Sequence, residues 1–269
     1  MIWCLDFHAP YRCHHAGACC KAGWTIPFED GTVAAQDDTG ACIFLDGRAR
    51  RCAIHRARGI DALPLACRMF PRVVLHDGRG TFVSLSHFCP TAAALLFEGS
   101  GRADIVGAPA ALANVGDLDG LDARHEWPPL LRPGVLMDLE SYGAWERRAV
   151  VLLTGDAVAA RDALARLEDV TARVIAWTPG SASLRDRVHG AFDQDRPPRM
   201  HAGSGRDTAV TRWLAARLFG AWSAYQGDGL AATMRYLRSC LQTFEEEVQR
   251  DADAREAIRR SDFRLLHRG

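Results

Sequence analysis

The placement of the cysteines constrains this chain more than any other feature. Eight of its nine cysteines lie between Cys4 and Cys89, and only Cys240 lies beyond them. Cysteines that merely fill a core are not expected to gather in one third of a chain. Seven of them run from the stretch CHHAGACC to the dipeptide CP, and these are Cys13, Cys19, Cys20, Cys42, Cys52, Cys67 and Cys89.

The chemistry of these side chains predicts a metal centre. A thiolate is a soft, anionic ligand suited to zinc, copper(I) and iron–sulfur clusters. Four thiolates, or three and an imidazole, complete a tetrahedral zinc site, and a cubane iron–sulfur cluster usually takes four thiolates. Seven thiols are enough for one such site with spares, or for two. Nearby imidazoles that could replace a thiolate are those of His14, His15, His55 and His87.

The adjacent pair Cys19 and Cys20 fits a single zinc ion poorly, because neighbouring side chains are expected to diverge. The pair would more easily serve two metals, a cluster, or one metal plus a reactive thiol. A thiol redox device built on this pair ranks last, because its disulfide would close a strained ring.

Composition and charge give no support to several other classes of protein. Basic and acidic residues both number 33, so no net charge draws the chain towards nucleic acid or acidic lipid. No run approaches the roughly 20 apolar residues that span a bilayer. The start, MIWCLDFHAPYRCHH, lacks a basic segment followed by an apolar one, so we expect a cytoplasmic protein. In a reducing cytoplasm, dense cysteines indicate metal binding or catalysis more often than disulfides.

Hydrophobic patterning predicts a mainly α protein with a small, irregular α+β metal-binding lobe. Residues 1–100 carry short apolar runs broken by Gly, Pro and Asp, which predict loops, short helices and a hairpin at RVVLHDGRGTFVSLS. Residues 101–137 are expected to form an extended connection, because prolines interrupt them. Residues 138–269 carry one-sided apolar stripes of helical period and predict a helical bundle on which the cysteine-rich lobe packs.

Basic residues lie among the later cysteines, and two interpretations remain open. The guanidinium groups could offset the negative charge of the thiolates, or they could bind an anionic ligand such as a carboxylate or phosphate. The residues concerned are Arg48, Arg50, Arg51, Arg56, Arg58, Arg68 and Arg72.

Four stretches, CHHAGACC, CIFLDGRARRCAIH, LACRMFPR and SLSHFCP, resemble the YkgJ-like cysteine-cluster family of zinc- or iron-chelating proteins. That family opens with Cys-x-x-Cys-Gly-x-Cys-Cys, and its second cysteine is Ala16 here, so Cys89, His14 or His15 is expected to supply the missing ligand. The resemblance implies as ligand candidates Cys13, Cys19, Cys20, Cys42, Cys52 and Cys67.

A narrower resemblance, in CCKAGWTIPF, CP and LESYGAWERRAVVLL, is to the flagellin lysine N-methylase branch. It implies an iron–sulfur cluster, S-adenosylmethionine as methyl donor, and a protein substrate such as flagellin. The chain shows neither the Cys-x3-Cys-x2-Cys motif of radical S-adenosylmethionine chemistry nor a strand followed by a glycine-rich loop. Methyl transfer therefore depends on resemblance alone.

Two functions follow. The first is a cytoplasmic metal-binding protein that holds an iron–sulfur cluster of the 4Fe–4S type, with zinc as second choice. The alternative is a lysine N-methylase-like enzyme, in which His87, His55 or His76 would keep the substrate amine unprotonated. We expect no nucleic-acid partner and no membrane association, and the sequence leaves the oligomeric state open.

Overall fold

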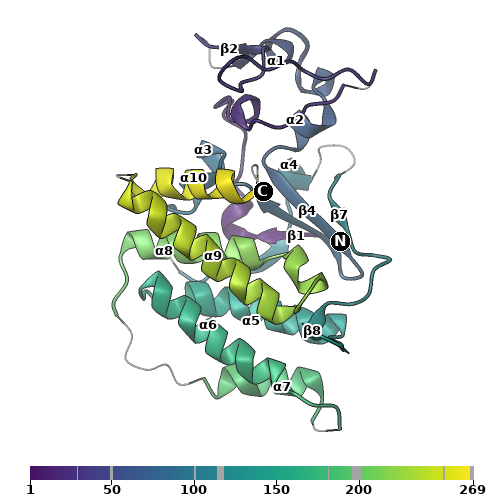
Figure 1. Ribbon diagram of the computed structural model, residues 1–269, viewed down its shortest axis with the longest axis vertical. Helices are drawn as coiled ribbons and strands as arrows, with labels where there is room; N and C mark the ends of the chain where they lie inside the picture. Colours follow the sequence, from purple (N-terminus) through teal and green to yellow (C-terminus); the bar gives the residue numbers. More distant parts are fainter. Residues whose placement is uncertain are drawn as a thin grey trace.

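The cysteine-rich segment forms one end of an elongated molecule, and helices form the other end (Figure 1). A small sheet lies between them. The computed structural model describes residues 1–28, 30–48, 51–99, 101–113, 118–180, 182–195, 201–250 and 252–266.

The second half of the chain is helical, as its apolar stripes predict. Its helices are α5 (Leu139–Gly155), α6 (Ala160–Ile175), α7 (Leu184–Asp193), α8 (Gly205–Leu218), α9 (Leu230–Gln249) and α10 (Ala254–Leu266). Trp145 and Trp213 are wholly buried in the core that these helices share. None of the helices described is long and apolar enough to cross a membrane.

A five-stranded sheet with the order β6-β1-β5-β4-β7 supports the cysteine-rich end. The expected hairpin is confirmed, with Arg72 paired to Leu85 and Asp77 paired to Gly80. Residues 101–137 supply two of the five strands, although we expected an extended connection there. The strands are β1 (Ile2–Leu5), β4 (Arg72–Asp77), β5 (Gly80–Leu85), β6 (Ile105–Gly107) and β7 (Leu121–Asp122). The rest of that segment forms helix α4 (Ala110–Ala113) and a separate pair of strands, β8 (Leu130–Arg132) and β9 (Val135–Leu136).

The two faces of the sheet lie in different cores, because side chains along a strand alternate between faces. Leu75 and Phe82 pack into the helical core. Their neighbours Val74 and Val83 pack into a second core, which also contains Cys89. The sheet therefore joins the helical bundle to the segment that carries the last cysteine of the series.

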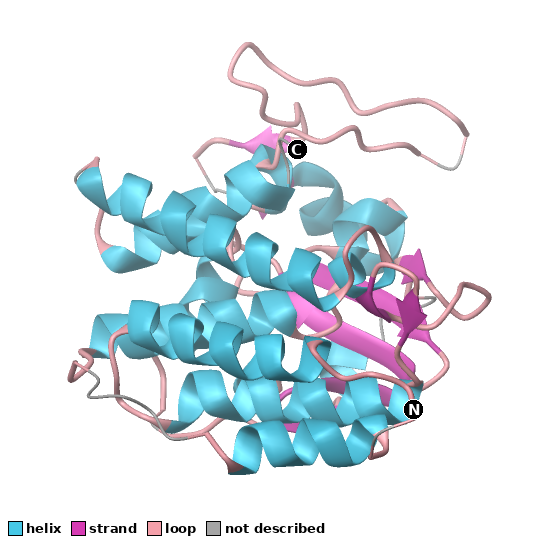
Figure 2. Ribbon diagram, turned by 60° about the horizontal axis from the view of Figure 1, so that its bottom comes forward, coloured by secondary structure: helices cyan, strands magenta, loops and turns pink. Residues whose placement is uncertain are grey.

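The cysteine-rich lobe has little regular structure. Figure 2 shows much of it as long loops that project from the body of the molecule. Its elements are the 3-10 helix Cys19–Lys21, strands β2 (Leu45–Asp46) and β3 (Arg51–Cys52), helix α1 (Ala53–Arg58), the 3-10 helix Ile60–Ala62 and helix α2 (Leu65–Met69). Helix α3 (Pro90–Leu95) follows the hairpin and contacts α10. The fold is thus a mainly α protein with a small α+β lobe, as predicted.

Candidate metal centre

Five of the seven cysteines of the series meet in the small core of the cysteine-rich lobe. Few apolar side chains share that core with them, among them Ile26, Trp24 and Phe44. So little apolar surface contributes weakly to folding, and a bound metal would add the stability that this lobe lacks. The five thiols are those of Cys19, Cys20, Cys42, Cys52 and Cys67.

Backbone hydrogen bonds bring these five positions together from separate stretches of chain. Gly17, at a φ of 70°, turns the chain into the 3-10 helix that carries the first two thiols. The amide of Cys42 donates to the carbonyl of Cys20 over 2.8 Å. Cys52 pairs with Leu45 across β2 and β3. These loops bury little apolar surface, so the backbone hydrogen bonds at the cysteines are what fix their relative positions.

The sulfur atoms of Cys19 and Cys20 lie 4.0 Å apart. The 3-10 turn brings the two side chains to the same side, whereas we expected neighbouring side chains to diverge. The hydrogen bond from the Cys20 thiol lowers the pKa of Cys19 to about 7, against the opposing effect of burial. The same bond raises the pKa of Cys20, and burial and the thiols of Cys19, Cys52 and Cys42 raise it further. This pair can present one thiolate at neutral pH.

The remaining thiols of the cluster repel each other's negative charge. Burial, and then Cys19, Cys52 and Cys42, raise the pKa of Cys67 to about 12. The pKa of Cys42 is raised as well, chiefly by burial. Thiols that resist ionisation together become ligands when a thiophilic cation neutralises them, and binding then releases their protons. The donor set therefore fits zinc or iron.

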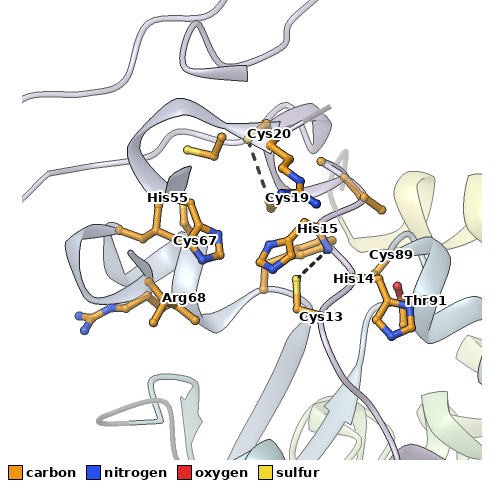
Figure 3. Close-up of a pocket in the computed structure, with 18 of the residues that line it drawn as sticks. Cys13, His14, His15, Cys19, Cys20, His55, Cys67, Arg68, Cys89 and Thr91 are labelled. Carbon is orange, nitrogen blue, oxygen red and sulfur yellow. Dashed lines mark hydrogen bonds between the residues drawn. The ribbon is translucent and has the colours of Figure 1, made fainter. Parts of the chain in front are cut away.

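A cavity of about 260 Å³ opens beside this cluster. In Figure 3, Cys67 and His55 lie on one side of it, and Cys89 and Thr91 lie on the other. Cys89 is buried in the second core, beneath the sheet, and its sulfur lies 3.8 Å from the Tyr11 hydroxyl. The cysteines that line the cavity are Cys13, Cys19, Cys20, Cys52, Cys67 and Cys89.

His14 and His15, which could supply the ligand missing at Ala16, also line this cavity. Both are exposed. His15 has a φ of 55°, an uncommon conformation for a residue with a side chain, and its ring lies 4.5 Å from that of His55. Its amide donates to the Cys13 sulfur over 3.4 Å. Cys13, His15 and His55 are thus neighbours at the cavity, and their role as ligands stays a prediction.

Among the described residues, no group of three or more His, Cys, Asp or Glu side chains is arranged so that it could hold a metal ion. The fit to a metal therefore lies in the chemistry of the five-thiol core. Four cysteines lie outside that core: Cys13 and Cys89 line the cavity, Cys4 is buried beneath the sheet and Cys240 among the helices.

The other histidines named as candidate bases lie away from this cavity. His76 is held by the Thr81 hydroxyl and the Leu118 carbonyl. His87 is wholly buried, where its Nε2 contacts that of His8 and its amide donates to the Asp262 carboxylate. Sequence reasoning missed His8 and Asp262, because they lie far apart along the chain with no motif around them.

One comparison with known proteins bears on this lobe. The family model CxxCxxCC, described as "Putative zinc- or iron-chelating domain", matches residues 12–90. The matched segment contains all seven cysteines of the series and ends before most of the helices begin. It supports the resemblance to the YkgJ-like cysteine-cluster family, and nothing in it tests the narrower resemblance to a methylase. Neither the curated proteins nor the solved structures gave a match.

Proposed function

We propose that this lobe holds an iron–sulfur cluster, in keeping with the match of residues 12–90 to a family model described as a "Putative zinc- or iron-chelating domain". The observation that carries the proposal is the gathering of five thiols into one small core. Thiolates bind iron–sulfur clusters through the iron atoms, and a cubane cluster usually takes four of them, one on each iron. When bound, such a cluster supplies one-electron redox chemistry.

The number of thiols is enough for either centre. A tetrahedral zinc site and a cubane cluster each take four protein ligands, so either would leave one thiol of this core unused. The ligands of the proposed cluster are drawn from Cys19, Cys20, Cys42, Cys52 and Cys67. Trp24 and Phe44 pack against these thiols and would keep water from the sulfur atoms.

Zinc is the second candidate, and one distance favours it. Two thiolates at the usual bond length of about 2.3 Å on one tetrahedral ion stand about 3.8 Å apart. The sulfur atoms of Cys19 and Cys20 are 4.0 Å apart. That distance suits two sulfur atoms that bind the same zinc ion, and in such a site both thiols are deprotonated. In a cubane cluster each iron usually takes one thiolate, so the pair would then supply one ligand and one free thiol.

Lysine N-methylation with S-adenosylmethionine, a flagellin-like substrate and a cytoplasmic location remain predictions from the sequence. No separate observation in the structure favours one of them.

Anaerobic purification followed by iron, acid-labile sulfide and zinc analysis tests the proposal. We expect a coloured protein with a broad visible absorption band and with iron and sulfide in equal amounts. A colourless protein with one zinc ion per chain selects the second candidate. A protein that carries neither metal, and takes up neither after reconstitution, overturns the proposed function.

A further inference from the structure

The cavity beside the thiol cluster is rich in positive charge. Its lining includes four arginines and, among the residues described, neither an aspartate nor a glutamate. The cysteines of the lining could offset that charge only as thiolates. The four arginines are Arg12, Arg51, Arg68 and Arg72.

Arg72 shows the imbalance most clearly. Its guanidinium donates to the carbonyl of Leu112 over 2.8 Å, to that of Ala111 over 3.2 Å and to that of Arg68 over 3.3 Å. All three acceptors are neutral, so the partly buried charge of Arg72 has no carboxylate partner among the residues that the structure describes. Burial accordingly lowers the pKa of Arg72. A charge placed this way is costly unless an anion approaches it.

Arg12 and Arg68 add to the positive charge. The guanidinium of Arg12 donates to the neutral carbonyl of Tyr11 over 2.8 Å. The Nε of Arg68 is buried and has no hydrogen-bond partner among the described residues. Figure 3 shows the side chain of Arg68 at the edge of the pocket, directed away from Cys13, so it contributes charge at the rim. By contrast, Arg56 on helix α1 pairs with Asp46 over 2.9 Å and does not line this cavity.

Balancing the thiol cluster does not explain this arrangement. The electrostatic neighbours that act on Cys42 and Cys67 are other thiols of the cluster. The groups that act on Arg72 are Tyr11 and Cys13, which lie outside that cluster. Arg72 therefore faces a part of the cavity that the five thiols do not occupy.

The rest of the wall is largely apolar, with Ile60, Leu63 and Phe70 among its residues. Drug-sized ligands occupy pockets of about 300–1,000 Å³, so a cavity of about 260 Å³ suits a smaller molecule. Fixed cations beside an apolar wall fit a ligand with a charged end and an apolar body. A carboxylate matches the planar guanidinium in shape and charge.

We propose that this cavity binds a small organic carboxylate, with its charged end towards Arg72 and Arg12 and its apolar body against Leu63 and Phe70. The site goes beyond metal binding, because none of these four side chains is a candidate metal ligand. The bound carboxylate would then lie next to the five-thiol core and next to the metal centre proposed for that core.

Calorimetric titration of the intact, anaerobically purified protein with benzoate and with benzamide tests the proposal. The two probes have the same shape and differ in charge. We expect benzoate to bind and benzamide to bind at least about tenfold more weakly, since a charge-assisted hydrogen bond is lost. Equal binding of the two probes, or no binding of benzoate, overturns the proposal. Metal analysis of the same samples shows separately whether the proposed metal function has failed.

Charge-removing variants locate the site. Arg72→Gln and Arg12→Gln should each weaken benzoate binding about tenfold. Arg12→Gln is the safer of the two for folding, because Arg72 also holds the carbonyls of Leu112 and Ala111. Arg56→Gln, in the same lobe but outside the cavity, is the matched control and should leave binding unchanged. Normal binding by Arg12→Gln and Arg72→Gln, or an equal loss in Arg56→Gln, contradicts the assignment.

Discussion

The Nε2 atoms of His8 and His87 lie 3.2 Å apart, and both side chains are excluded from solvent. The amide of His87 donates to the carboxylate of Asp262 on α10, and that carboxylate also accepts the indole N–H of Trp213 over 2.6 Å. This buried network ties the 3-10 helix Asp6–His8, the segment before Cys89 and two helices together. The helical bundle thereby holds one wall of the thiol-lined cavity in place.

The histidine pair predicts a loss of stability in mild acid. Burial, and then His87 and Arg217, lower the pKa of His8 well below its ordinary value. The unfolded chain, with a histidine pKa of about 6.5, therefore binds more protons than the folded one below that pH. The free energy of unfolding should be level above about pH 6.5 and should fall as the pH decreases below it. Urea unfolding between pH 8 and pH 5 measures the slope.

A His8→Gln variant is the control for this prediction, because glutamine keeps a hydrogen-bonding group and does not titrate. Its stability should fall less steeply with acid than that of the parent. If the two slopes are equal, His8 is not the source of the pH dependence.

A second buried network predicts a large cost for one arginine. Arg79 pairs with Asp77 over 2.7 Å and with Glu146 over 2.8 Å, and each carboxylate is 1% exposed. Tyr225 also donates to Asp77, over 2.6 Å. Arg79→Ala would leave two buried carboxylates without their cation, so we expect a loss of about 3–5 kcal/mol in the free energy of unfolding.

The matched control for Arg79 is Arg124→Ala, since Arg124 pairs with Asp122 over 2.6 Å at the surface. Exposed pairs contribute less than about 1 kcal/mol, so this variant should unfold almost as the parent does. Denaturant unfolding of both variants under one set of conditions makes the comparison. If the two variants lose similar amounts of unfolding free energy, the buried Arg79 pairs stabilise the protein no more than an exposed pair does.

Two glycines with similar, positive φ angles should differ sharply in their tolerance of a side chain. Gly227 and Gly229 have φ angles of 56° and 61°. A Cβ at Gly227 meets nothing within 4 Å, whereas one at Gly229 would lie 2.0 Å from the Leu130 carbonyl oxygen. Gly227→Ala should cost about 1–2 kcal/mol from backbone strain alone. Gly229→Ala should cost about 3 kcal/mol or more, because overpacking is added. Thermal melting measures both variants. Equal melting temperatures would show that a side chain at Gly229 does not clash with the Leu130 carbonyl.

Local sequence patterns predicted the elements that carry a strong periodic signal. The β4–β5 hairpin and helices α5, α6, α8 and α9 lie where the alternation and the apolar stripes indicated. Helices α7 and α10 fall in residues 138–269, which were predicted to be helical as a whole. The buried positions of α10 include Ser261 and Asp262, so polar residues interrupt its apolar face. The pairing of β1 with β5 joins residues far apart in the chain, and no short-range pattern specifies such a contact.

The candidate site was predictable in its residues and not in its arrangement. Cysteine spacing identified the set of seven, because thiol chemistry alone suggests ligation. It did not indicate that Cys13 and Cys89 lie apart from the five-thiol core, because loops without regular structure decide which thiols meet. The arginine-lined cavity likewise depends on tertiary structure, since Arg12 and Arg72 come from distant segments.

The five-thiol core should be the part of the molecule on which metal content depends. Cys67→Ser removes a thiol from that core, whereas Cys240→Ser removes one that is buried among the helices. Both changes replace a sulfur by a hydroxyl, at a half-buried position for Cys67 and a wholly buried one for Cys240. Cys240→Ser should therefore cost folding at least as much as Cys67→Ser, whereas only Cys67→Ser should reduce metal binding.

Iron, sulfide and zinc per chain, measured in these two variants beside the parent protein, test the central claim most directly. The account predicts metal in the parent and in Cys240→Ser, and a loss of at least half of it in Cys67→Ser. Full metal content in a folded Cys67→Ser protein, or an equal loss in Cys240→Ser, would contradict it.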